Sequence, residues 1–512
     1  MTLTRHFANV AGRRVHYRMA GSGPPLVMAH QSPRSSAELE PLMRRWAKHF
    51  TCIAPDTPGF GQSAPLPGHP GIDEFADAIV ALFDALDLKK VAAYGFHSGG
   101  IVLVTALRRH PERFSALAIG GYAVWTEEER RVFGESYLPR FTPSAYGEHL
   151  VWLWNRVLEQ TWFFPWFDVR HEARLGFAHA DPARTDLVIR DMLDSGDAYH
   201  AGYGAVLNAK RDIPAAGSGG PPVLITAYDG DPLQAHLARL GDLPASWSAR
   251  AVATPVAHQE ASLEFLRQHL APPAEPPPQV KDEGFCRVNS QGFEGLVHWR
   301  GDRASRRVLL HAPGGSAELL EGEDALKIDL PGHGLSDDCA LEAGISAWAR
   351  LAADAIGAVS TAPNAVIAGE ESSALLAIAA ARELGAEAVE AVRAHVPHPG
   401  AAVEWVERHP DLSPDRFGGY LTAAWAMVRS SCFFWPWFRA DAGHVIPFSA
   451  RDVALERLAL RHRSLIRARS GRALLRAVLT ADRTQLLAGA PPIRAWQVAE
   501  WARRHPRIWL PG

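Results

Sequence analysis

The chain of 512 residues is 47 % apolar and 21 % charged, with a formal net charge of −3. Its length suits two domains of roughly 250 residues better than one. No block of like charge favours nucleic acid or an anionic membrane surface as a partner, and no apolar run approaches the roughly 20 residues that span a bilayer. The four cysteines lie far apart without a CxxC pair, and residues 1–12 lack the apolar region of a secretory signal. We therefore expect a cytoplasmic protein without a disulfide framework or a zinc site.

Strand and helix patterns alternate along the first half of the chain. Short apolar runs predict buried strands at residues 25–29, 52–55, 91–94 and 222–226. Apolar residues at helical spacing predict helices at 75–88 and 101–109. A tryptophan-rich stretch from about 121 to 212 interrupts the alternation and is interpreted as a helical insertion. The pattern predicts an α/β fold with a mostly parallel sheet, helices on both faces and a cap.

A proline-rich segment divides the chain. Residues 271–278 contain five prolines in eight positions, and proline both lacks a backbone donor and disfavours helix in the residue before it. We interpret residues 271–282 as a stiff linker between a domain at 1–270 and a second domain at 283–512.

The two halves repeat each other. The aromatic run at 162–167 recurs at 433–438, an offset of 271, and the Asp-x-Pro-Gly-x-Gly-x-Ser segment at 56–63 recurs at 329–336, an offset of 273. Solenoid units are only about 20–50 residues long, so this period indicates a duplicated domain. We expect the halves to pack together as a pseudo-dimer, with a homo-oligomer as a further option.

A glycine-flanked turn follows the predicted strand at 91–94 and reads Tyr-Gly-Phe-His-Ser-Gly-Gly. A nucleophile at a tight strand-to-helix turn needs small residues two positions before it and two after it. Gly95 and Gly99 satisfy this rule around His97. The alternative register places Ser98 at the turn, but then the bulky Phe96 occupies a position that requires a small residue.

With this turn, the first half resembles the α/β-hydrolase family, and further family markers follow in the family's order. His30-Gln31-Ser32-Pro33 resembles the oxyanion loop, with glutamine in place of the usual glycine. The resemblance implies that backbone N–H groups at Gln31 and Ser98 stabilise an oxyanion. Asp231 then occupies the acid position, with Asp229 as a weaker alternative. His258, before a final amphipathic helix, occupies the histidine position.

The resemblance implies two tandem α/β-hydrolase-like domains, each with a helical cap. Insertions in this family usually roof the site, so Trp162, Phe163 and Trp166 are candidates for the wall of a substrate pocket. The same aromatic run is also consistent with the core of the insertion.

The altered turn leaves several chemistries open. His97 can attack a carbonyl carbon as a nucleophile, or His97 and His258 can divide acid and base roles, with Asp231 orienting His258. Ser98 is a further candidate nucleophile. A metal held by both histidines and Asp231 is a weaker alternative, since no HxH or HxxxH spacing supports it. Loss of activity is the remaining alternative.

The second half repeats the fold signals without this chemistry. Glu371 stands where the first half has His97, and the offset of 271 maps Asp231 onto Ala502 and His258 beyond the last residue. We interpret this half as a degenerate, shortened domain that packs against or regulates the first. A working carboxylate at Glu371 is the lesser alternative.

Taken together, the sequence predicts a hydrolase-fold enzyme that cleaves a small, fairly apolar carbonyl substrate, such as an ester, a thioester or a C–C bond, in the first domain. A cofactor-free lyase or decarboxylase that uses two histidines is the alternative within enzymes, and a catalytically silent ligand-binding or scaffold protein is the alternative outside them. We expect a small-molecule substrate and no cofactor, metal, nucleic-acid or membrane partner. The fold hosts many chemistries, so it does not name the substrate.

Overall fold

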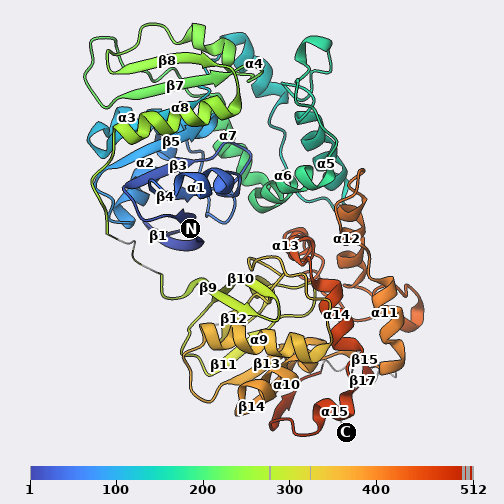
Figure 1. The fold of residues 1–512 in the computed structure, drawn as a ribbon. Coiled ribbons are helices and arrows are strands. Elements are labelled where there is room, and N and C mark those ends of the chain that lie inside the picture. The colour runs from blue at the N-terminus through green and yellow to red at the C-terminus, as the bar shows by residue number, and fades with distance from the viewer. Residues whose placement is uncertain are drawn as a thin grey trace. The chain divides into compact units, whose positions relative to one another are not determined.

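The structure is a computed structural model that describes residues 2–275, 278, 280–322, 324–498, 502 and 508–509. It divides into two compact units (Figure 1). One comprises Met1–Thr142 and Trp152–Val280, and the other comprises Pro143–Val151 and Lys281–Gly512. The boundary at Val280 falls in the predicted linker, of which Pro276, Pro277 and Gln279 lie outside the described residues. Within the described part of the chain, no helix is both long and apolar enough to cross a membrane.

The first unit contains an eight-stranded sheet with the order β1-β2-β4-β3-β5-β6-β7-β8. Its strands are β1 (Leu3–Val10), β2 (Arg13–Ala20), β3 (Pro25–Ala29), β4 (Thr51–Pro55), β5 (Val91–Phe96), β6 (Phe114–Gly120), β7 (Val223–Tyr228) and β8 (Trp247–Val252). β2 pairs antiparallel with β1 and β4, and the strands from β4 to β8 are parallel. The predicted, mostly parallel sheet is confirmed.

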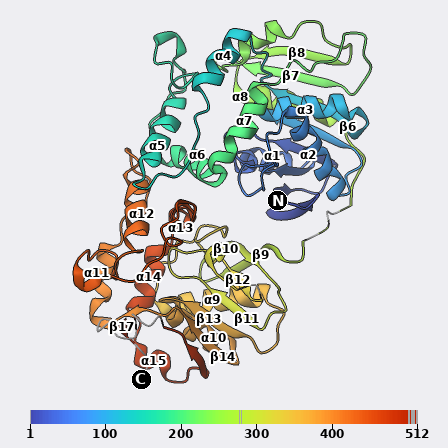
Figure 2. The same ribbon diagram turned by 180° about the vertical axis from the view of Figure 1, so that it is seen from behind.

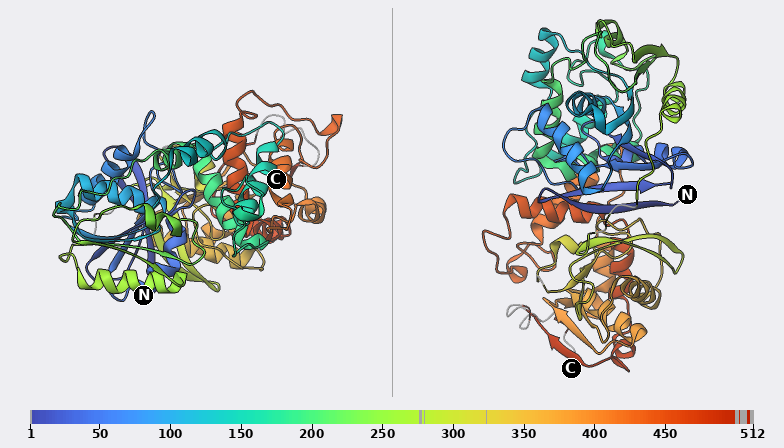
Figure 3. Two further views of the ribbon diagram at one scale, coloured as in Figure 1. Left: turned by 90° about the horizontal axis from the view of Figure 1, so that it is seen from above. Right: turned by 90° about the vertical axis from the view of Figure 1, so that its left-hand side faces the viewer.

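Helices cover both faces of this sheet. They are α1 (Glu40–Trp46), α2 (Ile72–Ala85), α3 (Ser98–Arg109) and α8 (Pro255–Gln268). Successive side chains of a strand point to opposite faces. Along β5, Val91 and Ala93 therefore join the core beneath α2 and α3, whereas Ala92 and Tyr94 join the core beneath α1 and α8. The left view of Figure 3 shows α8, in yellow-green, across the sheet from the blue α2 and α3.

The tryptophan-rich stretch forms helices between β6 and β7. These are α4 (Glu127–Ser136), α5 (Glu148–Gln160), α6 (Pro182–Ser195) and α7 (Tyr199–Leu207). Residues 143–151 belong to the second compact unit, which differs from the predicted boundary. Within that unit the Trp425 indole N–H donates to the Ala145 carbonyl at 3.2 Å, and Gly147, at φ +86°, lies against the same indole. A side chain at Gly147 would crowd this ring.

The second unit has a seven-stranded sheet whose order, read from β9, is β9-β10-β12-β11-β13-β14-β16. Its strands are β9 (Glu283–Ser290), β10 (Phe293–Arg300), β11 (Arg307–Leu310), β12 (Leu326–Ile328), β13 (Val366–Glu370), β14 (Ala388–Val392) and β16 (Ile493–Trp496), and β15 (Val396–Pro397) pairs separately with β17 (Ile508–Trp509). These seven strands have the same order as β1-β2-β4-β3-β5-β6-β7 of the first sheet. Among the described residues, the second sheet has no counterpart of β8.

Helices cover one face of the second sheet (Figure 2). The helices of the unit are α9 (Ile345–Val359), α10 (Ser373–Leu384), α11 (Ala402–Arg408), α12 (Gly419–Ser430), α13 (Leu455–Arg467), α14 (Gly471–Leu479) and α15 (Arg483–Leu487). Val308 and Val389 join the large core with α9 and α10. Their neighbours Arg307 and Glu390 point to the other face and form an ion pair at 2.8 Å. The apolar cluster on that face, around Leu309, Leu320 and Ala368, is smaller than its counterpart in the first unit, and no described helix matches α1 or α8.

Both units bury the same polar pair beside the sheet. Asp56 follows β4 and accepts a hydrogen bond from His16 of β2 at 2.9 Å, and Asp329 follows β12 and is bonded by His298 of β10 at 2.7 Å. Burial opposes ionisation of these aspartates, but their histidine partners outweigh it and lower both pKa values. The equivalent positions of the pairs support a common origin of the two units.

Candidate active site

His97 is the single residue between β5 and α3, and it forms the turn with φ 47° and ψ −113°. Such a conformation is strained for a residue with a side chain, and strain of this kind persists where the surrounding structure enforces it. The flanking glycines permit this tight turn here. A Cβ on Gly99 would lie 2.3 Å from the Ala29 carbonyl oxygen, and one on Gly95 would lie 2.6 Å from Gly100. The residue at the turn is therefore His97, and Ser98 is the first residue of α3.

Asp231 is the partner of His97. The His97 Nε2 atom lies 3.1 Å from Asp231 Oδ1 and 3.3 Å from Oδ2. Asp231 follows β7, and its carboxylate also accepts the Leu233 N–H at 2.8 Å. Burial raises the pKa of this carboxyl, but the hydrogen bond and charge of His97 outweigh that effect and hold the pKa below its usual value. With Nε2 protonated toward an ionised carboxylate, the lone pair of the imidazole is on Nδ1.

Two consecutive glycines at the end of β6 make room for this pair. A Cβ on Gly121 would lie 2.7 Å from His97 Cδ2 and 3.2 Å from Asp231 Oδ2, and one on Gly120 would lie 2.6 Å from His258 Nε2. Motif reasoning missed these positions. The signal was a Gly-Gly dipeptide at the carboxyl end of a buried strand, where close approach of side chains is one of the reasons for glycine.

His258 is placed differently from the expectation. It lies inside α8, not before a helix, and is 1 % exposed. Its Nδ1 lies 2.5 Å from Thr226 Oγ1, and its Nε2 lies 2.9 Å from the Tyr94 hydroxyl. Burial lowers the pKa of His258 to about 4, so the ring is neutral near pH 7.

The expected orientation of His258 by Asp231 is thus absent from the structure, since both ring nitrogens have hydroxyl partners. The physical reason is the short connection before α8. Strand β8 ends at Val252 and α8 begins at Pro255, which leaves no loop to carry a histidine over the edge of the sheet. A metal held by His97, Asp231 and His258 is not supported either, because both ring nitrogens of His258 are already bonded to hydroxyl groups.

The loop at residues 30–33 also differs in detail from the expectation. The Gln31 N–H, proposed as an oxyanion donor, donates instead to Glu38 Oε1 at 2.7 Å. The next N–H, that of Ser32, donates to Ser98 Oγ at 2.6 Å, and Ser98 Oγ lies 3.2 Å from Ser32 Oγ. Ser98 is therefore bonded to this loop and to neither imidazole. The N–H of Ser98 is the first of α3 and has no partner within the helix.

His97 opens into a cavity of about 320 Å³ between the sheet edge and the helices of the insertion. Its walls are mostly apolar and include Phe96, Ile101, Trp125, Phe164, Val206 and Leu207. This volume lies at the lower end of small-molecule sites. The cavity therefore suits a compact, apolar ligand that meets His97 at one end.

The three aromatic residues expected in the wall do not line this cavity. Trp162 donates its indole N–H to the His179 carbonyl at 2.7 Å, and Trp166 donates to the Tyr137 carbonyl at 3.2 Å. Trp162, Phe163 and Trp166 are half-buried within the insertion, and Phe164 lines the cavity in their place. A buried indole N–H needs an acceptor, and backbone carbonyls of the insertion supply it.

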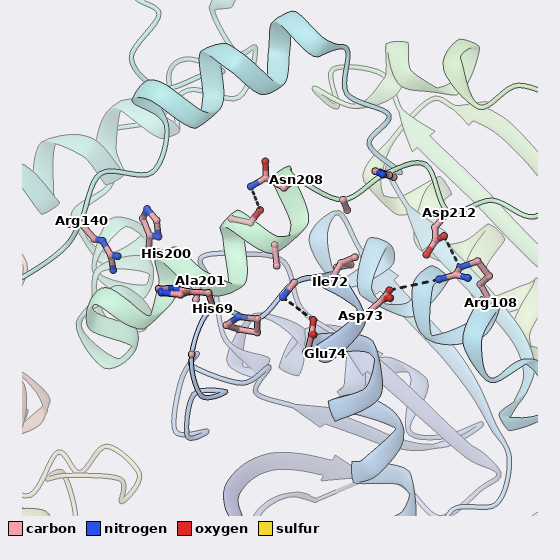
Figure 4. Close-up of a pocket in the computed structure, with 17 residues that line it drawn as sticks. His69, Ile72, Asp73, Glu74, Arg108, Arg140, His200, Ala201, Asn208 and Asp212 are labelled. Atoms are coloured by element: carbon pink, nitrogen blue, oxygen red, sulfur yellow. Dashed lines mark hydrogen bonds and ion pairs between the residues drawn. The ribbon is translucent and has the colours of Figure 1, made fainter.

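A second, more open pocket of about 760 Å³ lies between α7 and the start of α2 (Figure 4). Both arginines that line it already have partners. Arg108 pairs with Asp212 at 2.6 Å, and Arg140 pairs with Asp197, also at 2.6 Å. Because both guanidinium groups are paired with carboxylates and no non-glycine residue of the lining has a positive φ, this pocket is a weaker candidate for catalysis than the His97 cavity.

Residues 24–252 match the family model described as alpha/beta hydrolase fold. The chain is similar to a soluble epoxide hydrolase of Corynebacterium sp., with 39 % identity over 101 residues, 20 % of this chain and 35 % of that protein. It is also similar to a cis-3-alkyl-4-alkyloxetan-2-one decarboxylase of Shewanella oneidensis, with 33 % identity over 120 residues, 22 % of this chain and 37 % of that protein. A solved structure, Epoxide Hydrolase A from Mycobacterium thermoresistibile, has a TM-score of 0.41 and 16 % identity, covering 52 % of this chain and 98 % of that one. The chain spans half or less of the length of the curated relatives it matches.

Proposed function

Because residues 24–252 belong to the α/β-hydrolase fold family, we propose that the first unit is an enzyme that hydrolyses a small, fairly apolar ester or thioester with His97 as its base. The observation that carries the proposal is the bond between His97, at the strained turn, and the buried carboxylate of Asp231. A histidine bonded to a buried carboxylate in the wall of a mostly apolar cavity has the features of a general base.

In the proposed reaction, His97 Nδ1 removes a proton from a water molecule as the water oxygen adds to the carbonyl carbon. The carbonyl π electrons move to its oxygen, which becomes the oxyanion. Collapse of this intermediate breaks the C–O or C–S bond, and the leaving group takes the proton from His97. Asp231 stabilises the imidazolium that exists between the two proton transfers.

The oxyanion would lie between the start of α3 and the loop at residues 30–33. The N–H of Ser98 is in the first turn of a helix, where it has no partner within the helix and where the helix dipole favours negative charge. Ser32 offers a hydroxyl and an N–H at the same place, both now bonded to Ser98 Oγ. Rotation of the Ser98 side chain would release the Ser32 N–H toward the substrate.

A cofactor-free lyase or decarboxylase is the second candidate. Like the hydrolysis above, it needs no side-chain nucleophile, which agrees with the absence, among the described residues, of a hydroxyl or thiol bonded to His97. A relative named as an oxetan-2-one decarboxylase is consistent with it. In this case His97 would deliver or remove the proton at the carbon next to the carbonyl group.

A panel of p-nitrophenyl esters and thioesters with acyl chains of two to eight carbons, compared with β-lactone and β-keto acid substrates, tests both candidates. Hydrolysis of the esters that falls roughly 10²–10⁴-fold in His97→Ala supports the hydrolase. Release of carbon dioxide from the β-lactones or keto acids, also dependent on His97, supports the lyase instead. Tight binding of these compounds without turnover of any of them would contradict both enzymatic candidates and indicate a protein that binds ligands without catalysis.

A further inference from the structure

The second unit keeps the strained turn that holds His97 in the first. Glu371 follows β13 and precedes α10, with φ 53°. As in the first unit, a glycine permits the turn, since a Cβ on Gly369 would lie 2.2 Å from the Ser373 carbonyl oxygen. A strained turn of this kind is costly to keep in a domain that serves only as packing.

Glu371 also opens into a cavity, of about 280 Å³. Its side chain is half-buried and faces this space. His395, which follows β14, places Nε2 at 3.6 Å from Glu371 Oε2. Burial raises the pKa of Glu371, but attraction to His395 and Arg461 outweighs it, so the pKa is lowered and the carboxylate is ionised.

Arg461, on α13, lines the same cavity and supplies the opposite charge. Its guanidinium donates to Ser431 Oγ at 2.8 Å and to Cys432 Sγ at 3.2 Å, both of which are neutral acceptors. A guanidinium carries five N–H donors, so these two bonds do not exhaust it. The other acid at the cavity, Glu370, is already paired with Arg393, so we expect Glu371 and not Glu370 to accept a hydrogen bond from a ligand.

Aromatic and aliphatic side chains form the rest of the wall, among them Trp405, Met427, Phe434, Trp435 and Trp437. The cavity thus has an apolar body and one polar end that offers an acceptor, Glu371, and a donor, Arg461. A ligand of net charge +1 or −1 would meet a like charge there as well as an opposite one. A neutral head with an N–H beside a C=O would bond to both groups without that repulsion.

We propose that the second unit is a separate binding site for a compact apolar molecule with a carboxamide head. The amide N–H donates to Glu371, the amide oxygen accepts from Arg461, and the apolar body lies against the tryptophans. The volume and the apolar lining are typical of specific small-molecule sites in proteins, which place a few polar groups in an otherwise apolar pocket. This site is independent of the chemistry at His97.

Calorimetric titration of the full chain with three probes of one aromatic body tests the proposal: phenylacetamide, phenylacetate and phenethylamine. We expect phenylacetamide to bind at one site per chain and more tightly than the two charged probes. Glu371→Gln and Arg461→Met should each weaken its binding by roughly 10–100-fold, as expected for loss of a hydrogen bond to a charged group. Met427→Trp, which fills the cavity, should abolish binding.

The matched controls separate this site from the first unit and from misfolding. His97→Ala and the surface variant Glu383→Gln, which removes an exposed partner of Arg350, should bind phenylacetamide as the natural chain does. Each variant is first shown to unfold at a temperature close to that of the natural chain. Equal binding of all three probes, binding that survives Met427→Trp, or no binding by the natural chain overturns the proposal.

Discussion

His97 Nε2 lies 3.1 Å from Asp231 Oδ1, although 134 positions separate the two residues in the chain. Strand β6 separates β5 from β7 in the sheet, so the contact bridges a whole strand at the carboxyl edge. In the pattern expected from the sequence, the carboxylate orients a histidine that lies on a separate loop. Here the histidine bonded to the carboxylate is the turn residue itself. The turn residue and the imidazole bonded to the buried carboxylate are therefore one side chain, and the proposed reaction uses it as the base.

Removal of the carboxylate should disable this base. In Asp231→Asn the amide can no longer stabilise the imidazolium, so we expect kcat on the best ester or lactone to fall roughly 10²–10⁴-fold with little change in KM. The matched control is Asp229→Asn, two residues earlier in the same turn, where the exposed carboxylate bonds Gln234. Equal losses in both variants would contradict the pairing with His97.

Ser98 should not form a covalent intermediate. Its hydroxyl is bonded to Ser32 and not to an imidazole, so it lacks a base to activate it. We expect Ser98→Ala to keep activity within about tenfold. Intact-mass measurement after treatment with a fluorophosphonate should show no adduct. A stoichiometric adduct on Ser98, together with a burst of product, would show that the serine is the nucleophile.

Burial of neutral His258 should make the first unit sensitive to acid. Its pKa is lowered to about 4 in the folded chain against 6.5 for the free side chain, so the unfolded state binds more protons between these values. The free energy of unfolding should therefore fall as the pH is lowered from 6.5 toward 4, by ~3 kcal/mol from this residue.

His258→Gln keeps hydrogen-bonding groups near Thr226 and Tyr94 but does not titrate. Urea unfolding at pH 7 and pH 4.5 should show a smaller loss of stability in this variant than in the natural chain. His69→Gln, at an exposed site, serves as the control and should leave the loss unchanged. A loss in His258→Gln as large as in the natural chain would mean that the ring is already charged in the folded state.

Substrate size should depend on Phe164. This side chain lines the His97 cavity, whereas Trp166 does not. Phe164→Leu enlarges the cavity, so KM should fall for esters with longer acyl chains and rise or stay constant for the shortest. Trp166→Phe should lower stability without a change in chain-length preference, because it loses a bond within the insertion. A change in chain-length preference in Trp166→Phe but not in Phe164→Leu would instead support the sequence-based prediction that Trp166 lines the substrate pocket.

The turn at His97 and the position of Asp231 after a strand could be predicted because their signals are local, whereas the expected partner of Asp231 was His258 and not His97. Gly95 and Gly99 mark the turn through steric demands within a few residues, and Asp231 follows a recognisable strand. The strands and the boundary near the proline-rich segment were accessible for the same reason.

The partners of these residues could not be predicted in the same way. Whether His258 stands before α8 or within it depends on the length of the connection after β8, which the apolar pattern leaves open. The bond from Gln31 to Glu38 arises from a neighbouring short helix, which no motif marks. The cavity of the second unit requires His395 and Arg461 from segments that share no motif with Glu371.

The two-residue connection between Val252 and Pro255 has a consequence for protein engineering. Installing a serine at position 97 would supply a hydroxyl without an available imidazole, because both ring nitrogens of His258 are already bonded to Thr226 and Tyr94. Converting this scaffold into a serine esterase would require a longer loop grafted before α8, in addition to the new nucleophile. The natural protein is therefore several coordinated changes away from that chemistry, and a library of point variants should not reach it.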